Sequence, residues 1–259
     1  MKYNLYNNKI KLEFDEAKHK YLVDGKIVYG VTGILSVLST PALINWAVKL
    51  TADKVREMKQ YIPDSLEDVL KAAKYEHYRV SKEARELGTR VHRVADSWFF
   101  ENKLELIEEM LKVESTDERN ALRAFIKLVK DVKMEREFGE RKIYSKKHGY
   151  AGTVDFIGKI EGVETVADYK TSRAIYPSYF IQAAAYAQAI EEELGKKIKQ
   201  TAVIRIAKDG TLEIKTDKKW KEKLPVFLAM KSIYEWQMSL VGKDLDKKVE
   251  EQNNKPNKK

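Results

Sequence analysis

The sequence contains no cysteine. This absence excludes disulfide bonds, thiolate zinc sites, cysteine-bound iron–sulfur clusters and cysteine nucleophiles. It is compatible with a reducing compartment. The sequence also lacks any run near the roughly 20 apolar residues that a membrane-spanning helix needs. Residues 1–9 have no apolar core of the kind found in a signal peptide. We therefore expect a cytoplasmic protein that does not associate with membranes.

Two motifs of hydrolytic enzymes are also missing, one typical of ATPases and one typical of ester hydrolases. No Gly-x-x-x-x-Gly-Lys-Ser/Thr segment is present, which excludes a P-loop ATPase. No Gly-x-Ser-x-Gly segment is present, which excludes a nucleophile elbow of the hydrolase type. Any hydrolytic chemistry in this chain must therefore use other groups.

Basic residues are in excess. The chain of 259 residues has 49 Lys and Arg against 40 Asp and Glu, a formal net charge of +9. Such a surplus favours a polyanionic partner, because basic groups near phosphates release condensed counterions. Apolar residues make up 43% of the chain, enough for a large core. The length predicts one large domain or one domain with an elaborated subdomain.

The first part of the chain predicts a hairpin followed by helices. Strand-like segments 20–23 and 26–29 flank Asp24-Gly25, and both of these residues tolerate a positive φ. Thr40-Pro41 predicts a helix start with Thr40 as its cap. Residues 64–136 are expected to be almost wholly helical, with starts at 63–65, about 81 and 115–118, the second helix ending near 102. We interpret residues 1–80 as a hairpin with a helical elaboration.

From Glu140 onward the pattern predicts strands alternating with helices. Segments 142–144, 152–160 and 163–171 are rich in β-branched residues and predict strands, with a turn at Glu161-Gly162. A helix is expected over 177–194 with Gly195 as its C-cap, followed by strands at 201–206 and 212–214 and a helix at about 218–240. Residues 81–242 thus predict an α/β core, and the charged residues 243–259 predict a flexible tail.

Two carboxylates and a lysine can meet in this core. Asp168 and Lys170 are two apart on a predicted strand, so their side chains leave one face and Tyr169 leaves the other. The turn at 161–162 would pair this strand with the one that carries Asp155. Two carboxylates suit Mg²⁺, which could polarise a phosphate and activate a bound water that the lysine orients or deprotonates. An ordinary cross-strand ion pair is the alternative.

Four residues after this trio extend the candidate site. Thr171 and Ser172 carry hydroxyl groups that can hold a phosphate. Gln182 and Tyr186 lie one helical turn apart and can place an amide and a phenol beside the same site. The alternative for this pair is ordinary packing of a helix against the sheet.

His92 lies on a predicted helix between Arg90 and Arg93. As a metal ligand it would shift the preference from Mg²⁺ toward Mn²⁺; a structural histidine at a helix–sheet contact is the alternative. The two arginines either contact phosphates or form a solvated face. Glu140 is either a further acidic ligand or plain surface charge. The remaining histidines are poor candidates, namely His19, His77 and His148.

Together these residues resemble the PD-(D/E)xK nuclease superfamily, in its RecB-like, phage-type exonuclease branch. Residues 88–92 look like the histidine motif of that branch, and residues 152–155 like its first acidic motif. Asp168-Tyr169-Lys170-Thr171-Ser172 matches its Asp-x-Lys-Thr-Ser motif, and residues 182–186 its Gln-x-x-x-Tyr motif. The segments 19–21, 24–26, 31–32 and 43–47 are similar to phage-type members, and the surroundings of Glu140 and Asp155 to mitochondrial genome-maintenance exonucleases.

Two departures from the family pattern are visible. No proline precedes Asp155 in the place that gives the superfamily its name, as in many of its members. The lack of cysteine separates the chain from relatives that hold an iron–sulfur cluster.

The resemblance implies a restriction-endonuclease-like α/β core, a mixed central sheet flanked by helices, with a helical N-terminal elaboration. It implies a DNA nuclease of phage or bacterial recombination and repair that acts in the cytoplasm, uses Mg²⁺ or Mn²⁺ and leaves 5′-phosphates, with exonucleolytic action expected. The metal ligands would be His92, Asp155, Asp168 and the backbone carbonyl of Tyr169. Lys170 would help to activate the attacking water, and Gln182 and Tyr186 would position DNA or support the site.

Several alternatives stay open from sequence alone. A DNA-binding module with a degenerate site, or a structure-specific endonuclease on the same fold, would carry a similar pattern. The substrate could be single-stranded DNA or double-stranded DNA with ends. A recombination partner protein and an oligomer are both compatible with the sequence.

Overall fold

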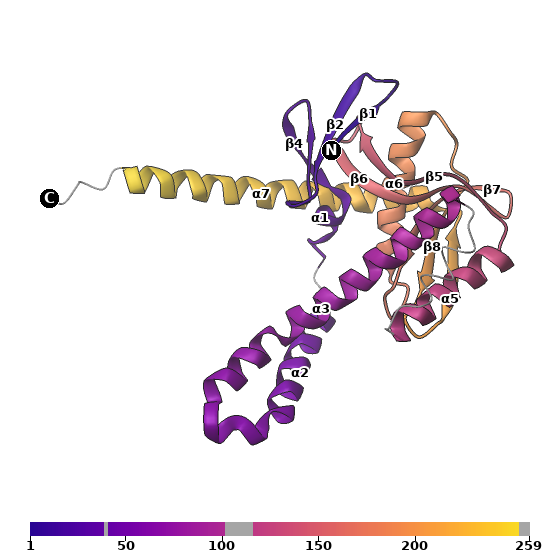
Figure 1. Ribbon diagram of the computed structural model, residues 1–259. Helices are drawn as coiled ribbons and strands as arrows, with labels where there is room; N and C mark the ends of the chain where they lie inside the picture. The colour runs from indigo at the N-terminus through magenta and orange to yellow at the C-terminus, as the bar shows by residue number, and fades with distance from the viewer. Residues whose placement is uncertain (39–40, 102–115, 254–259) are drawn as a thin grey trace.

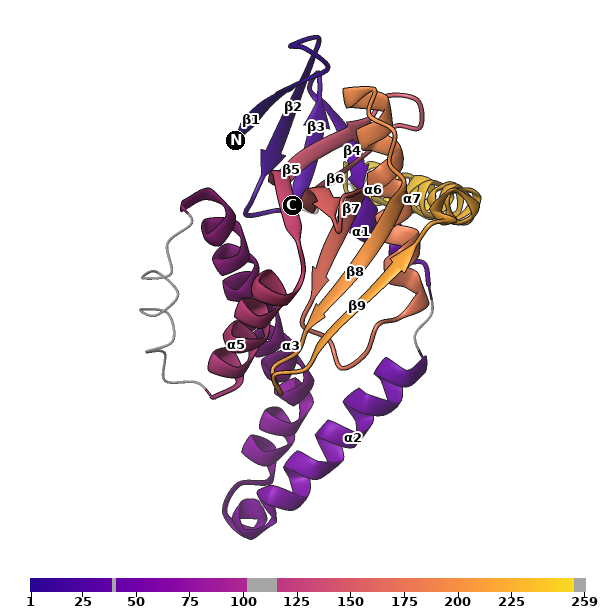
Figure 2. The same ribbon diagram turned by 90° about the vertical axis from the view of Figure 1, so that its right-hand side faces the viewer.

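The computed structural model describes residues 1–38, 41–101 and 116–253. Within these ranges the protein is a mixed α/β structure with a nine-strand mixed sheet and six helices. The strand order is β1-β2-β3-β4-β6-β7-β8-β9, and β5 pairs with β6 off this path. Figures 1 and 2 show the sheet with α6 beside one face and α5 beside the other. The expected α/β class is confirmed.

The N-terminal strands form an antiparallel meander that joins the main sheet. They are β1 (Lys2–Leu5), β2 (Ile10–Asp15), β3 (Lys20–Val23) and β4 (Lys26–Gly30). Asp24 and Gly25 take φ values of 50° and 76°, as expected for the predicted hairpin turn. β4 then pairs in parallel with β6, through Tyr29–Tyr150 and Gly30–Ala151. The first thirty or so residues therefore share one sheet with the predicted core.

The remaining strands are β5 (Met134–Ser145), β6 (Tyr150–Ile160), β7 (Val163–Lys170), β8 (Gln200–Ile206) and β9 (Leu212–Asp217). The predicted β6–β7 hairpin is confirmed: Glu161 and Gly162 form its turn with φ values of 50° and 75°. The expectation that strands begin near Glu140 is wrong, because β5 starts at Met134. The charged stretch 134–141 resembles a helix end in sequence, but it alternates between exposed and partly buried positions and pairs with β6.

The helices are α1 (Val31–Leu35), α2 (Pro41–Glu57), α3 (Ile62–Glu101), α5 (Thr116–Asp131), α6 (Pro177–Leu194) and α7 (Leu224–Asn253), with 3-10 turns at Lys59–Tyr61 and Trp220–Lys223. The predicted C-cap of α6 is confirmed, since Gly195 has the left-handed φ of 63°. The predicted caps Thr40 and Ser115, and the helix end at Asn102, lie outside the described residues. No helix in the described part of the chain is both long and apolar enough to cross a bilayer.

Helix α3 runs through two positions where the sequence suggests helix starts. At Ser65 the backbone leaves the helical region, and the Asp68 N–H donates to Ser65 Oγ at 3.4 Å, so the start predicted at 63–65 matches a real kink. The start predicted near Ser81 is wrong. Arg79 binds Glu76 on one side and Glu83 on the other, and these ion pairs span residue 81 within one continuous helix. The expected boundary at residue 80 also falls inside α3.

Helix α7 continues past Leu240, where its end is expected, to Asn253. The segment 243–253 has no proline and no glycine and contains several Lys and Glu residues, so helix propensity favours its continuation. The flexible tail predicted from residue 243 is therefore wrong up to Asn253, and residues 254–259 lie outside the described residues. Figure 1 shows most of α7 extending away from the sheet.

The two faces of the sheet carry separate cores. On one face, residues such as Val154 and Ile157 of β6 pack with Ile190 of α6, Trp220 and Phe227. The second core lies on the other face, where residues of the sheet meet α5 and the Val91 turn of α3, and it contains Leu122, Phe125, Phe156, Tyr169 and Ile204. Burial on both faces fixes the positions of β6 and β7, the strands that carry Asp155 and Asp168.

Candidate active site

A gap in the sheet defines the candidate site. β5 occupies one edge of β6 along its full length, from Tyr150 to Ile160. β4 and β7 must therefore share the other edge: β4 pairs with residues 150–151, and β7 with residues 156–160. Residues 152–155 face the interval between them. A cavity of about 210 Å³ opens here, large enough for a phosphate group or several waters.

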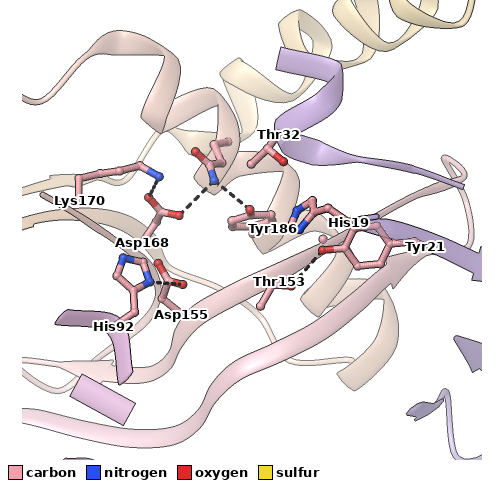
Figure 3. Close-up of a pocket in the computed structure, with 11 residues that line it drawn as sticks. His19, Tyr21, Thr32, His92, Thr153, Asp155, Asp168, Lys170 and Tyr186 are labelled. Carbon is pink, nitrogen blue, oxygen red and sulfur yellow. Dashed lines mark hydrogen bonds and ion pairs between the residues drawn. The ribbon is translucent and has the colours of Figure 1, made fainter. Parts of the chain in front are cut away.

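The two predicted carboxylates meet at this gap. The β6–β7 ladder ends at the Phe156–Ala167 pair. Beyond that pair, Asp155 Oδ2 accepts a hydrogen bond from the Tyr169 N–H at 2.8 Å. The carboxylate thus replaces a backbone carbonyl as the acceptor where the ladder stops. Asp168 projects from β7 into the same cavity (Figure 3). The Tyr169 ring lies on the opposite side, edge-on to Phe125, as the alternation predicts. Metal binding by the Tyr169 carbonyl stays a prediction.

Each oxygen of Asp168 has a partner. Lys170 Nζ lies 2.6 Å from Asp168 Oδ2, the predicted same-face neighbour. Gln182 Nε2 donates to Asp168 Oδ1 at 3.2 Å and to the Tyr186 hydroxyl at 2.9 Å. Lys170 also lies over the Tyr179 ring, 4.9 Å from its centroid. The Gln182–Tyr186 pair thus orients Asp168 rather than merely packing on the sheet.

His92 reaches the site from α3. Its Nδ1 lies 3.3 Å from Asp155 Oδ1, and its ring stands edge-on to Tyr169 at 5.9 Å. Helix α3 passes close to Thr171, the residue that follows β7. If Gly88 of α3 had a Cβ, this atom would lie only 3.3 Å from Thr171 Oγ1. Gly88 therefore permits the close approach that carries His92 to Asp155.

The environment separates the two carboxylates electrostatically. The pKa of Asp168 is raised to about 6. Burial is the main cause, the negative charge of Asp155 raises the pKa further, and Lys170 partly offsets both effects. The pKa of Asp155 lies below its ordinary value, because His92 and Lys170 outweigh the effect of burial. Burial lowers the pKa of His92, but Asp155 raises it more, to about 9. Pairs of acids held at different pKa values are typical of catalytic sites.

The donor set suits a hard divalent cation. Among the described residues, no three side chains of His, Cys, Asp or Glu are grouped so as to hold a metal ion. Mg²⁺ does not require such a group, since it is commonly held by one or two carboxylates, waters and substrate phosphate. Each oxygen of Asp155 and Asp168 has one partner and keeps a second lone pair. The pKa of Asp168 is raised because the positive charge near this buried carboxylate does not fully offset the cost of burying it.

Other predicted residues are not brought to the cavity. Arg90 and Arg93 lie on α3 outside the cavity lining, partly buried and exposed respectively. Thr171 contacts the α3 backbone region instead, and the Ser172 hydroxyl donates to the Ala174 carbonyl at 2.8 Å. Glu140 is exposed, has a φ of 42°, and its charge acts on Tyr3. Glu140 is not among the residues that line the cavity, so a role for it as a metal ligand stays a prediction.

The structure adds residues to which sequence reasoning gave no role in the site. His19, Tyr21, Thr32 and Thr153 line the same cavity. His19 is treated as a poor candidate from sequence because nothing local connects it to Asp155. The sequence feature that could have pointed to these residues is the similarity of segments 19–21 and 31–32 to phage-type members. Its meaning becomes clear once β4 is seen to pair with β6.

Comparison with known proteins gives no independent assignment: no protein-family model and no curated protein matches the chain. The interpretation of the site therefore depends on the residues and contacts described above.

Replacing Gly152 by alanine should destabilise the site. A Cβ at this position would lie 2.7 Å from Cε1 of Tyr186, inside a packed core. Overpacking of this kind costs about 1–3 kcal/mol, which lowers the melting temperature by about 2–4 °C per kcal/mol in a domain of this size. Differential scanning calorimetry of Gly152→Ala measures this. Gly33→Ala is the matched control, because its Cβ would meet only the phenol end of Tyr234, at ordinary contact distances of 3.5 Å and 3.8 Å. Equal melting temperatures for the two variants would contradict the prediction.

Stability without metal should fall as pH rises from about 6.5 to about 9. In this window folded His92 keeps its proton, since its pKa is about 9, whereas unfolded His92, with the ordinary histidine pKa of about 6.5, loses it. The folded state then binds more protons than the unfolded state, so stability decreases with pH. Melting temperatures measured in EDTA across this range test the slope. His92→Asn should flatten it; an unchanged slope in that variant would assign the effect to other groups.

Proposed function

We propose that this protein is a metal-dependent DNA nuclease with a restriction-endonuclease-like core. The observation that carries the proposal is the meeting of Asp155 and Asp168 with Lys170 in one cavity, at the gap in the β6 edge. The contacts of Gln182 and His92 support it, because each fixes one of the carboxylates. The net charge of +9 supports a polyanionic substrate.

Asp155 and Asp168 would hold the cation, with His92 beside Asp155. A bound divalent ion supplies a Lewis acid for the scissile phosphate. The ion would also favour the ionised form of Asp168, whose pKa is about 6 without it. Gln182 keeps one oxygen of Asp168 oriented while the ion and substrate bind.

Lys170 would act as a donor rather than as a base. Burial lowers its pKa, but Asp168 and Asp155 raise it above the ordinary lysine value. The ammonium group therefore keeps its proton at neutral pH. It can orient the attacking water and stabilise negative charge that develops on the phosphate. In-line attack of that water would leave a 5′-phosphate, and we propose exonucleolytic action.

Cleavage of end-labelled DNA tests the proposal. Linear and circular DNA, single- and double-stranded, are incubated with Mg²⁺, Mn²⁺ or EDTA. We expect linear DNA to be degraded with metal and preserved in EDTA, while circular single strands stay intact. Cleavage of circles would instead identify an endonuclease. No cleavage with either metal, together with tight and salt-sensitive binding, would refute the nuclease and favour a DNA-binding module.

A further inference from the structure

The cavity has a second end that contains no carboxylate. Its lining there comes from His19 of the β2–β3 turn, Tyr21 of β3, Thr32 of α1 and Thr153 of β6. Figure 3 shows His19, Tyr21 and Thr32 on one side of the cavity, and Lys170, Asp168, Asp155 and His92 on the other. Hydroxyl and imidazole groups can all donate hydrogen bonds to an anion. The cavity therefore has an acidic end and a donor end.

Packing and hydrogen bonding fix the donor end. The Tyr21 hydroxyl and Thr153 Oγ1 lie 3.0 Å apart. The Tyr21 ring lies against Gly30, where a Cβ would come within 3.0 Å of it. Phe14 and Tyr21 hold the His19 ring edge-on, with centroids at 5.2 Å and 6.0 Å. Neither ring nitrogen of His19 has a hydrogen-bond partner among the described residues. The imidazole is thus held in place by ring contacts, and its nitrogens can still bond to a ligand.

The spacing between the two ends suits a nucleic-acid strand. Thr153 and Asp155 are two positions apart on β6, and their side chains leave the same face. At the rise of a β-strand this places them about 7 Å apart. Neighbouring phosphates of a DNA strand are separated by a similar distance. A strand whose scissile phosphate lies at Asp155 would thus present its next phosphate to the donor end.

We propose that His19 and Thr32, together with the Tyr21–Thr153 hydroxyl pair, bind a second phosphate of the substrate, adjacent to the scissile one. This inference rests on the proposed nuclease function and adds the substrate contact that the acidic end cannot make. The bound group is either the next phosphodiester in the strand or a phosphomonoester at the strand terminus. Both offer the same non-bridging oxygens to the imidazole and hydroxyl donors.

Binding of short single-stranded oligonucleotides in EDTA tests the site without cleavage. Fluorescence anisotropy compares the wild-type protein with the variants His19→Asn and Thr32→Val. Asn tolerates the φ of 49° at residue 19, and Val keeps the shape of Thr32 without its hydroxyl. We expect about tenfold weaker binding for His19→Asn, the loss of one hydrogen bond to a charged group. In Mg²⁺ the KM should rise by a similar factor, with kcat changed less than KM.

His148→Asn is the matched control, because His148 lies in the β5–β6 turn outside the cavity and its replacement should leave binding unchanged. Oligonucleotides with a 5′-phosphate or a 5′-hydroxyl identify the ligand. An effect of His19→Asn restricted to the 5′-phosphate form assigns a terminal monoester. An equal effect on both forms assigns an internal diester.

The outcomes separate this site from the nuclease activity. Wild-type affinity and KM in both variants would overturn the second phosphate site, even if DNA is cleaved. Weaker binding by both variants, with no cleavage by the wild-type protein in any metal, would overturn the nuclease and leave a phosphate-binding site. If His19→Asn melts early, Thr32→Val decides, since an exposed hydroxyl on α1 contributes little to folding.

Discussion

Asp168→Asn should lower DNA cleavage by at least about a thousandfold, corresponding to about 4 kcal/mol of transition-state stabilisation that depends on the metal. The substitution keeps the shape of the side chain and the Gln182 contact, but it removes the charge that would hold the cation. Cleavage rates at saturating Mg²⁺ and Mn²⁺ measure the loss. Asp131→Asn, at the exposed end of α5, is the matched control and should retain full activity.

The same variant should be more stable than the wild-type protein in EDTA. The pKa of Asp168 is about 6, so at pH 8 the folded protein without metal contains a buried carboxylate that burial disfavours. A neutral amide removes this cost. A higher melting temperature together with lost activity would show that Asp168 lowers the stability of the folded protein and is nevertheless needed for activity, a trade-off typical of active sites. Normal turnover by folded Asp168→Asn would remove Asp168 from the active site.

Lys170→Met should lower kcat by about 10²–10⁴-fold, the range for loss of a positioned proton-handling or charge-stabilising group. Methionine keeps much of the length of the side chain that lies on Tyr179 but cannot donate a hydrogen bond. DNA affinity measured in EDTA should stay within about threefold of wild type, since a single contact is lost from a surface that relies on many. Lys159→Met, on the exposed side of β6, provides the control.

Removal of Lys170 should also change the metal requirement. Its ammonium group lowers the pKa of Asp168, so the variant holds Asp168 with a still higher pKa. Protons then compete more strongly with the cation at a given pH. We expect half-maximal activity at a higher Mg²⁺ concentration, with the difference decreasing as pH rises. An unchanged metal requirement at every pH would show that Lys170 acts on the substrate alone.

The sequence predicts the local parts of the fold well. The β6–β7 hairpin follows from β-branched runs on either side of Glu161-Gly162, and the end of α6 follows from Gly195. Each depends on residues close together in the chain, for which turn and cap rules are sufficient. The start of β5 and the length of α7 were missed, because charged stretches at 134–141 and 243–253 carry little apolar pattern.

The acidic half of the site was predictable for the same reason. Asp155, Asp168 and Lys170 meet through one hairpin, and Gln182 and Tyr186 through one helical turn. The donor half was not predictable from local rules, because His19 reaches the cavity only through the parallel pairing of β4 with β6. Tyr21 and Thr153 are 132 positions apart in the chain, and no periodicity relates such distant residues.

That parallel pairing has a consequence during synthesis of the chain. Residues 29–30 leave the ribosome long before residues 150–151, so β4 has no partner on that edge while the intervening helices are being made. Closing so long a loop costs entropy before any contact between the strands is made, which slows folds that depend on distant strand pairs. The cavity therefore forms only after β6 and β7 have emerged. A nascent chain that has not yet reached β6 and β7 can contain the N-terminal meander and α3 but not the assembled cavity, so the proposed activity would appear only after most of the chain has been translated.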